Sequence, residues 1–168
     1  MPGFKVAPNY KLINSGTLSS GSLVLFPEKK DKLLPCLVIK NGLSSENNGV
    51  LLQELYGEYH NFEYNLDHKP VLEVLDEWRF RLNTSVPPNS VFAPIDVPIG
   101  KIAVAEGGWF FKTSRSPRHS LYYVDLEQAQ TTASIEGISY YSDWTIETRA
   151  DASEPWQLFY NPLNAARP

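Results

Sequence analysis

Cysteine and methionine are scarce in this chain, since each occurs once among 168 residues. With Cys36 as the single cysteine, an intramolecular disulfide is impossible. Cys36 lies inside the apolar run 33–39, where a free thiol behaves as a small buried hydrophobic group. The amino-terminal segment 1–15 contains no apolar stretch of signal-peptide length. Both features favour a soluble protein in a reducing, cytoplasmic compartment.

Long apolar segments and excess positive charge are also lacking. The longest apolar run, 33–39, is far shorter than the roughly 20 residues that a membrane helix needs, and Pro35 interrupts it. Lys and Arg number 15 against 19 Asp and Glu, so the net charge of −4 disfavours broad attraction to nucleic acid or anionic lipid. The favoured partner is therefore another protein. Nucleic acid is the alternative partner, and no membrane partner is expected.

The familiar catalytic and cofactor motifs are missing. The chain contains no phosphate-binding loop, no dinucleotide-binding glycine turn and no Gly-x-Ser-x-Gly elbow. The nearest approach to a metal site combines His60, Glu63, Asp67 and His68, whose spacing matches no strong zinc motif. A helix cap at Asp67 beside a solvated imidazole explains these residues more simply. We expect no cofactor and no metal, and binding is favoured over catalysis.

The composition is that of an ordinary folded domain. Hydrophobic residues make up 42% of the chain and charged residues 20%, which is enough apolar surface for one core. We expect a single domain over 1–168, with two lobes, 1–82 and 100–168, joined by a proline-rich connection over 83–99. That connection is expected to be irregular because its prolines lack backbone donors: Pro87, Pro88, Pro94 and Pro98.

Short runs rich in β-branched and aromatic residues alternate with turn signals along most of the chain. This spacing predicts a mainly β protein, either an antiparallel sandwich, a roll or a small SH3-like barrel elaborated with extra strands and one or two short helices. We expect strands over residues 22–26, 34–40, 50–55, 101–104, 109–112, 119–125, 134–141, 144–148 and 156–160.

Two further segments and one core cluster complete the expected fold. Residues 70–82 fit a short helix that passes into a strand, and 126–133 fit one or two helical turns. Strand alternation predicts that the first three strands bury one apolar face together with the Cys36 thiol. The members of that face are Val24, Phe26, Leu37, Ile39, Leu51 and Leu55.

One hairpin resembles part of a known family. The run Gly21-Ser22-Leu23-Val24-Leu25-Phe26, a charged loop, and the run Leu34-Pro35-Cys36-Leu37-Val38-Ile39 together resemble the first hairpin of SH3-like barrels. That group includes the toxin ribonucleases of the PemK and MazF kind, so the resemblance implies a small barrel that acts on RNA. Those ribonucleases carry a basic residue before the proline that opens the second strand, and here Leu34 precedes Pro35.

The segment 113–119 gathers polar and basic side chains between two aromatic-rich stretches. Arg115 and Arg118 supply guanidinium groups that bind phosphate or carboxylate through paired hydrogen bonds, and His119 titrates near neutral pH. Trp109 and Tyr122 offer rings that stack on a base or contact a partner. We predict a binding surface from these five residues. A solvated hairpin tip beside ordinary core aromatics is the alternative interpretation.

The sequence supports two hypotheses about function. The first is a cytoplasmic protein-interaction module, such as an immunity protein, antitoxin or inhibitor, that binds a basic partner through aromatic and acidic surface. The observations that support this hypothesis are the net charge, the aromatic content and the acid-rich segment 54–77. The second is an RNA-binding or ribonuclease-like small β-barrel that uses the Arg and His loop.

Overall fold

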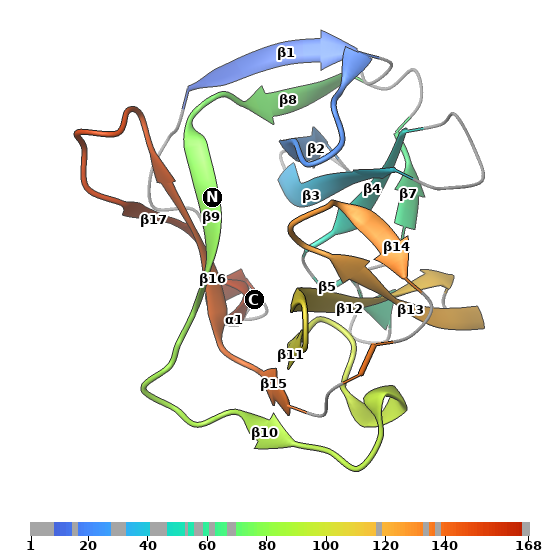
Figure 1. Cartoon of the computed structure of the whole chain (residues 1–168). Helices are drawn as coiled ribbons and strands as arrows, with labels where there is room; N and C mark the ends of the chain where they lie inside the picture. The colour runs from blue at the N-terminus through green and yellow to red at the C-terminus, as the bar shows by residue number, and fades with distance from the viewer. Residues whose placement is uncertain are drawn as a thin grey trace.

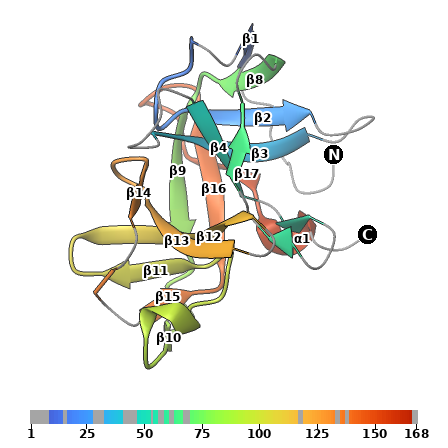
Figure 2. The same ribbon diagram turned by 90° about the vertical axis from the view of Figure 1, so that its right-hand side faces the viewer.

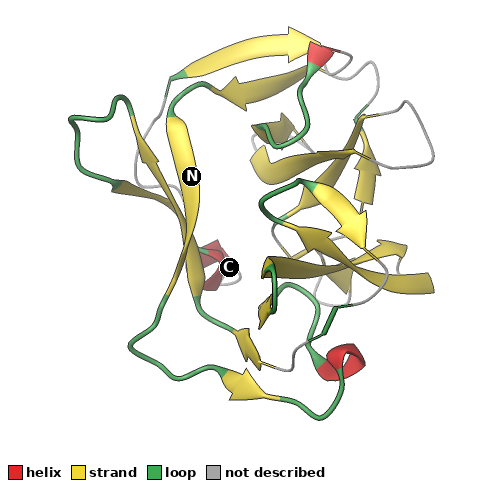
Figure 3. Ribbon diagram, viewed as in Figure 1, coloured by secondary structure: helices red, strands yellow, loops and turns green. Residues whose placement is uncertain are grey.

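The protein is built almost entirely from β-strands joined by loops (Figure 3). The computed structural model describes residues 9–14, 17–27, 33–40, 47–52, 54–55, 59–60, 63–66, 70–116, 119–132, 135–136 and 139–165. The predicted mainly β class is confirmed. Over these residues none of the three sheets closes on itself, which leaves the antiparallel sandwich among the architectures that the sequence favours.

Most strands belong to one large sheet of twelve strands, which runs from β1 and β8 at the top of Figure 1, along its right side, to β15 and β10 at the bottom. Its pairs are antiparallel, apart from one bridge between Gln130 and Lys40 that joins its two halves. In spatial order the strands are β1 (Tyr10–Asn14), β8 (Pro70–Val74), β2 (Leu23–Pro27), β3 (Leu33–Lys40), β14 (Gln130–Thr132), β13 (His119–Asp125), β12 (Gly108–Ser116), β11 (Ile102–Ala105), β15 (Ser139–Tyr141) and β10 (Asn89–Ser90), with β4 (Asn47–Leu51) and β7 (Glu63–Asn65) branching from β3.

A smaller sheet of three strands covers one face of the large sheet. Its order is β17 (Gln157–Tyr160), β16 (Trp144–Arg149) and β9 (Glu77–Leu82), and its strands run across those of the large sheet (Figure 2). A separate ribbon pairs β5 (Glu54–Leu55) with β6 (Tyr59–His60). The short helix α1 (Pro162–Ala165) follows β17. Among the residues described, no helix has the length and apolar character needed to cross a bilayer.

Trp144 lies at the centre of the core between the two sheets. Its side chain is 1% exposed and packs edge-on against Phe80 and Phe111, with ring centroids 5.5 and 5.7 Å away. The indole Nε1 donates a hydrogen bond of 3.0 Å to the Gly100 carbonyl. Since Phe80 comes from the small sheet and Phe111 from the large one, this indole joins the two layers.

The helix expected at the start of 70–82 is wrong, because this segment forms β8 and β9. Val71 and Val74 are spaced like one face of a helix, but in a strand they point to opposite faces. Both faces of β8 are buried. Val74 joins the core between the sheets, whereas Val71 joins a second, separate cluster of buried residues, the outer cluster. The chain then bends at Leu75 and Asp76 and enters the small sheet as β9.

The single core cluster expected from the first strands is also wrong in its grouping. β2 pairs with β3 so that Val24 faces Cys36 and Leu23 faces Leu37, and both faces are buried. Leu37 therefore joins the core between the sheets with Ile39, while Val24 joins the outer cluster with Phe26. The predicted burial of Cys36 is confirmed. The side chains of Leu51 and Leu55 lie outside the described part.

The proline-rich connection is irregular apart from the two residues of β10 and a 3-10 turn over Pro94–Asp96, as predicted. The buried Lys112 side chain anchors it: Nζ donates to the carbonyl oxygens of Pro94 and Ile95 at 3.1 and 3.5 Å. Tyr123 accepts a third hydrogen bond from Nζ at 3.3 Å and donates its own proton to Pro94. Burial lowers the pKa of Lys112 and raises that of Tyr123 to about 12.

The turns around β12 and β14 are tight. Residues 126–129 form a turn before β14 instead of the helical turns expected there, because Asp125 Oδ1 accepts from the backbone N–H of Glu127 and Gln128. Gly107 and Gly108 connect β11 to β12 with φ values of +99° and +147°, which other residues rarely adopt.

Replacing Trp144 with alanine tests whether this indole joins the sheets. The variant loses a buried side chain and leaves the Gly100 carbonyl without its donor. We expect the free energy of unfolding to fall by about 3–5 kcal/mol, as for other buried Trp truncations. Urea denaturation gives the value, and Trp109→Ala is the matched control at a ring that is 39% exposed. Equal losses for the two variants would contradict the assignment.

Candidate functional site

The predicted binding residues divide between the two ends of the β12–β13 hairpin. Trp109 stands at the start of β12 and Arg115 near its end, about 20 Å away for six residues of extended strand. His119 is paired with Ser116 at the Arg115 end, and Tyr122 is paired with Thr113 in the middle. The structure therefore brings Arg115 and His119 to one end of the hairpin and separates both from Trp109.

The loop part of the predicted site stays a prediction. Arg118 lies outside the described residues, as do the side chains of Arg115, His119 and Tyr122. Of the described aromatic side chains after residue 108, Trp109 alone is more than a third exposed. The others fill the core or its margins or, in the case of Trp156, lie between two arginine side chains. Trp109 is thus the member of the predicted surface from which a site can be built.

A groove of about 460 Å³ lies beside Trp109. Three consecutive residues of β9 form one wall and the floor, and residues of the β12 start and the turn after β13 form the second wall. A hydrogen bond of 3.0 Å from Leu126 N to the Trp109 carbonyl holds the second wall together. The lining is mostly apolar, and its members are Trp78, Arg79, Phe80, Gly108, Trp109, Leu126 and Glu127.

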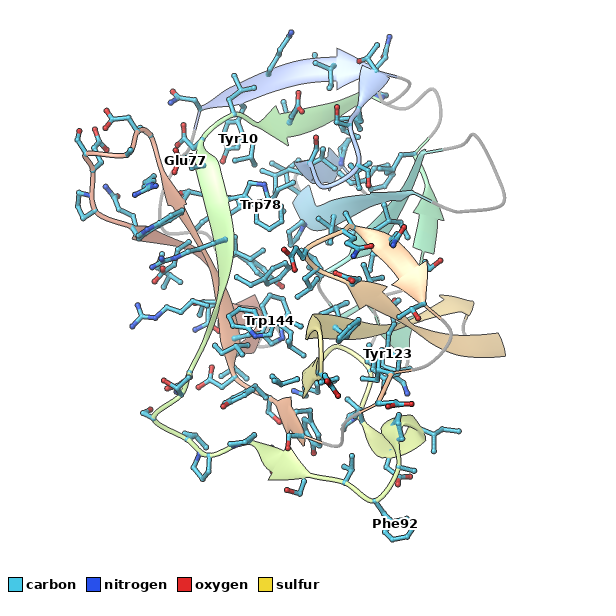
Figure 4. The ribbon with its side chains drawn as sticks, in the orientation of Figure 1. Tyr10, Glu77, Trp78, Phe92, Tyr123 and Trp144 are labelled. Atoms are coloured by element: carbon cyan, nitrogen blue, oxygen red, sulfur yellow. The ribbon has the colours of Figure 1, made fainter. Side chains whose placement is uncertain are left out.

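The floor of the groove is aromatic. Trp78 and Phe80 stack edge-to-face with ring centroids 5.6 Å apart, and both extend from β9 toward the large sheet. Figure 4 shows Trp78 on this inner side of β9, the same side as Trp144. Because Phe80 also contacts Trp144, the floor rests directly on the core. Such a floor is fixed before any partner arrives.

The rim of the groove carries uncompensated negative charge. Glu127 lines the groove, and Glu106 lies on the turn that leads into its Gly108 wall. Over the described residues neither carboxylate accepts a hydrogen bond or forms an ion pair. Arg79 also lines the groove, but its guanidinium is committed to Glu147 through two hydrogen bonds of 3.0 and 2.8 Å. The charged groups at this rim that have no partner among the described residues are therefore the two carboxylates.

The outer face of the small sheet carries a ladder of cross-strand polar pairs. Register places Glu77 opposite Arg149 and Arg79 opposite Glu147, and each of these pairs is bridged by its own ion pair. Arg81 reaches Glu147 diagonally at 2.8 Å. Trp156 lies between two guanidinium groups, with Arg79 at 4.2 Å and Arg149 at 4.4 Å from its ring. The ladder joins β9 to β16 on the face away from the core.

Glu147 is the centre of this ladder. Its side chain is 6% exposed, and burial alone raises the pKa of its carboxyl group. Hydrogen bonds from Arg81 and Arg79, together with their charges, outweigh burial and hold that pKa below its usual value. A second hollow, of about 560 Å³, opens below Arg81 and includes Asp143 and Asn161. Both of its lining acids have partners: Glu147 is paired with Arg79 and Arg81, and Asp143 accepts a hydrogen bond of 2.7 Å from Asn83 Nδ2.

In the acid-rich segment 54–77, the acidic side chains that the structure describes form hydrogen bonds or ion pairs within the protein. Glu73 accepts a hydrogen bond from Ser22 Oγ at 3.1 Å, and Asp76 accepts one from Asn9 Nδ2 at 2.7 Å. Glu77 is paired with Arg149. The side chains of 54–65 lie outside the described part, as do Asp67 and His68 of the tentative metal cluster. In the portion of the chain that the structure covers, no three His, Cys, Asp or Glu residues gather to hold a metal ion.

Comparison with protein-family models, with curated proteins and with solved structures finds no match for the chain.

The β9 and turn residues of the groove were not predicted from the sequence. The one sequence signal for these residues was the alternation of Trp78 and Phe80 with Arg79 and Arg81, which predicts a strand with one apolar face. That alternation does not say which strand edge remains unpaired. Nor does it place Leu126 and Glu127, some 45 residues later, against that strand.

Replacing Glu147 with glutamine tests the role of the ladder. Because the folded-state pKa of Glu147 is lowered, its stabilisation is present above the usual carboxyl pKa and is lost as the pH falls through the folded value. We expect the variant to lose about 1–3 kcal/mol of unfolding free energy at pH 7. Urea denaturation at pH 7 and at about pH 3 should show the difference from the parent protein shrinking. A pH-independent difference would refute this role, and Glu154→Gln is the exposed control.

Proposed function

We propose that the chain is a cytoplasmic protein-interaction module that binds a basic partner at the groove between β9 and β12. The observation that carries the proposal is Trp109, a tryptophan 39% exposed beside an apolar groove. Tryptophan is enriched among residues whose truncation weakens protein interfaces most, particularly where a pocket lies next to it. This is the kind of surface through which an immunity protein, antitoxin or inhibitor engages its target.

Charge supports a basic partner. The chain has a net charge of −4, and the groove adds Glu127 and the nearby Glu106, whose carboxylates find no partner among the described residues. Such charges steer an oppositely charged protein and raise its association rate. The apolar floor of the groove provides affinity, and the acidic rim provides selectivity for a basic partner.

The groove is a better docking site than Phe92, the most exposed aromatic among the described residues. Phe92 is 99% exposed on the proline-rich connection, and Figure 4 shows it pointing away from the body of the protein. It lines neither the groove nor the hollow below Arg81. Trp109, in contrast, shares a continuous apolar surface with Trp78, Phe80 and Leu126. Continuity of this kind, with water excluded around the anchor, distinguishes an interface centre from a single exposed ring.

Synthetic peptides test the proposal. The probes share a core of about six residues with Leu or Phe at every second position and carry either Lys or Glu at both ends. We expect the Lys-ended peptides to bind more tightly, and Trp109→Ala to weaken their binding tenfold or more, which corresponds to about 1.4 kcal/mol or more. Glu127→Gln should reduce the preference for Lys ends, and added salt should do the same. Fluorescence anisotropy measures each affinity.

Two control variants show whether binding depends on the groove. Phe92→Ala removes an exposed aromatic that does not line the groove, and Glu154→Gln removes an exposed acid that does not line it. Both should bind like the parent protein, and all four variants should melt cooperatively. Absence of binding, or equal weakening by Trp109→Ala and Phe92→Ala, would show that the groove is not the interface.

A further inference from the structure

We infer that the partner binds as an added β-strand along the free edge of β9. The inference rests on the proposed function, since it specifies how the groove holds its partner. Its starting point is that Trp78, Arg79 and Phe80, three consecutive residues, line one groove. Side chains of successive strand residues point to opposite faces. A groove that touches all three therefore runs along the edge of the strand, where the backbone is exposed.

Among the described residues, no strand pairs with this edge of β9. β9 is the last strand of its sheet, with β16 as its neighbour on one side. Asn83, which follows β9 and lies opposite Asp143, donates its N–H to the Asp143 carbonyl at 3.0 Å. Hydrogen-bonded pairs alternate in an antiparallel ladder, so Arg81 and Arg79 bond to β16. The N–H and C=O groups of Trp78 and Phe80 therefore point away from β16.

These outward groups are available for a new strand. In the described part of the chain, the backbone N–H groups of Trp78 and Phe80 have no hydrogen-bond partner on this edge. An extended peptide laid along the edge satisfies them with its own backbone, as in other cases of strand addition. Alternate side chains of the peptide then enter the groove between Phe80 and Trp109, and the intervening ones face solvent.

A foreign strand fits this edge better than a second copy of β9. If two β9 strands paired antiparallel around Phe80, Arg79 of one copy would lie directly opposite Arg81 of the other. Like charges directly opposite each other destabilise a sheet. The groove walls add apolar contact on one face of the incoming strand, which favours a segment with apolar residues at every second position. We therefore assign the groove to an extended segment of another protein.

Backbone methylation of the bound peptide is the first test. The probe is the tightest Lys-ended peptide, made as a series in which each core amide in turn carries an N-methyl group. N-methylation removes one backbone donor and leaves the side chains unchanged. We expect losses of about tenfold or more at every second position, and small effects at the positions between them. Equal losses at all positions, or no losses, would overturn strand addition.

Amide hydrogen exchange in the protein is the second test. In the free protein, the Trp78 and Phe80 amides should exchange quickly, and the Arg79 and Arg81 amides should exchange slowly because they bond to β16. Saturating peptide should slow exchange at Trp78 and Phe80 at least tenfold and leave Arg79 and Arg81 nearly unchanged. The two arginine amides are the internal control.

The outcomes separate the mode of binding from the proposed function. If the peptide binds, Trp109→Ala weakens it, and yet the Trp78 and Phe80 amides gain no protection, the partner docks through side chains and strand addition is wrong. If no probe binds, or if binding ignores Trp109, the proposed function fails and strand addition fails with it. Self-association of the protein through this edge, detected by sedimentation, would also overturn the assignment to a foreign strand.

Discussion

The packing of the two sheets around Trp144 determines which surfaces of β9 remain free to bind a partner. The indole touches Phe80 of β9 and Phe111 of β12 and donates to Gly100, so it fixes the small sheet against the large one. The inner face of β9 is thereby committed to the core. Its outer face is committed to the ladder centred on Glu147. The edge of the strand is what remains for a partner, and the proposed groove lies there.

The fold class follows from the sequence because short apolar runs between turn residues are a local signal. The expected strands over 101–104, 109–112, 119–125, 144–148 and 156–160 all appear, with boundaries shifted by a few residues. At β8 and at the β2–β3 hairpin the apolar pattern gave the wrong structure or grouping, because both faces of these strands are buried. There Val71 and Val74, or Val24 and Leu37, enter different clusters, and a pattern based on one buried face cannot separate them.

The candidate site was predictable only in part, for a related reason. Trp109 was identified because its ring lies near the Arg and His loop in the sequence and can stack on a base or contact a partner. Its partners Leu126 and Glu127 meet β9 through the arrangement of two sheets, which is a property of topology and not of any local run. Lys112 shows the opposite case. It is a lysine in a strand, and nothing in its neighbourhood in the sequence indicates that the large sheet buries it to hold Pro94 and Ile95.

An exposed strand edge is a liability that a protein must restrict, and β9 carries devices that do so. Arg79 and Arg81 oppose pairing with a second β9, and the bend at Asp76 and the turn after Asn83 keep the strand to six residues. The groove walls admit only a strand that brings apolar side chains to Phe80 and Trp109. The acidic charge of Glu127 then favours basic segments among those candidates. Backbone pairing alone is indifferent to sequence, so selectivity at this edge comes from the side chains around it.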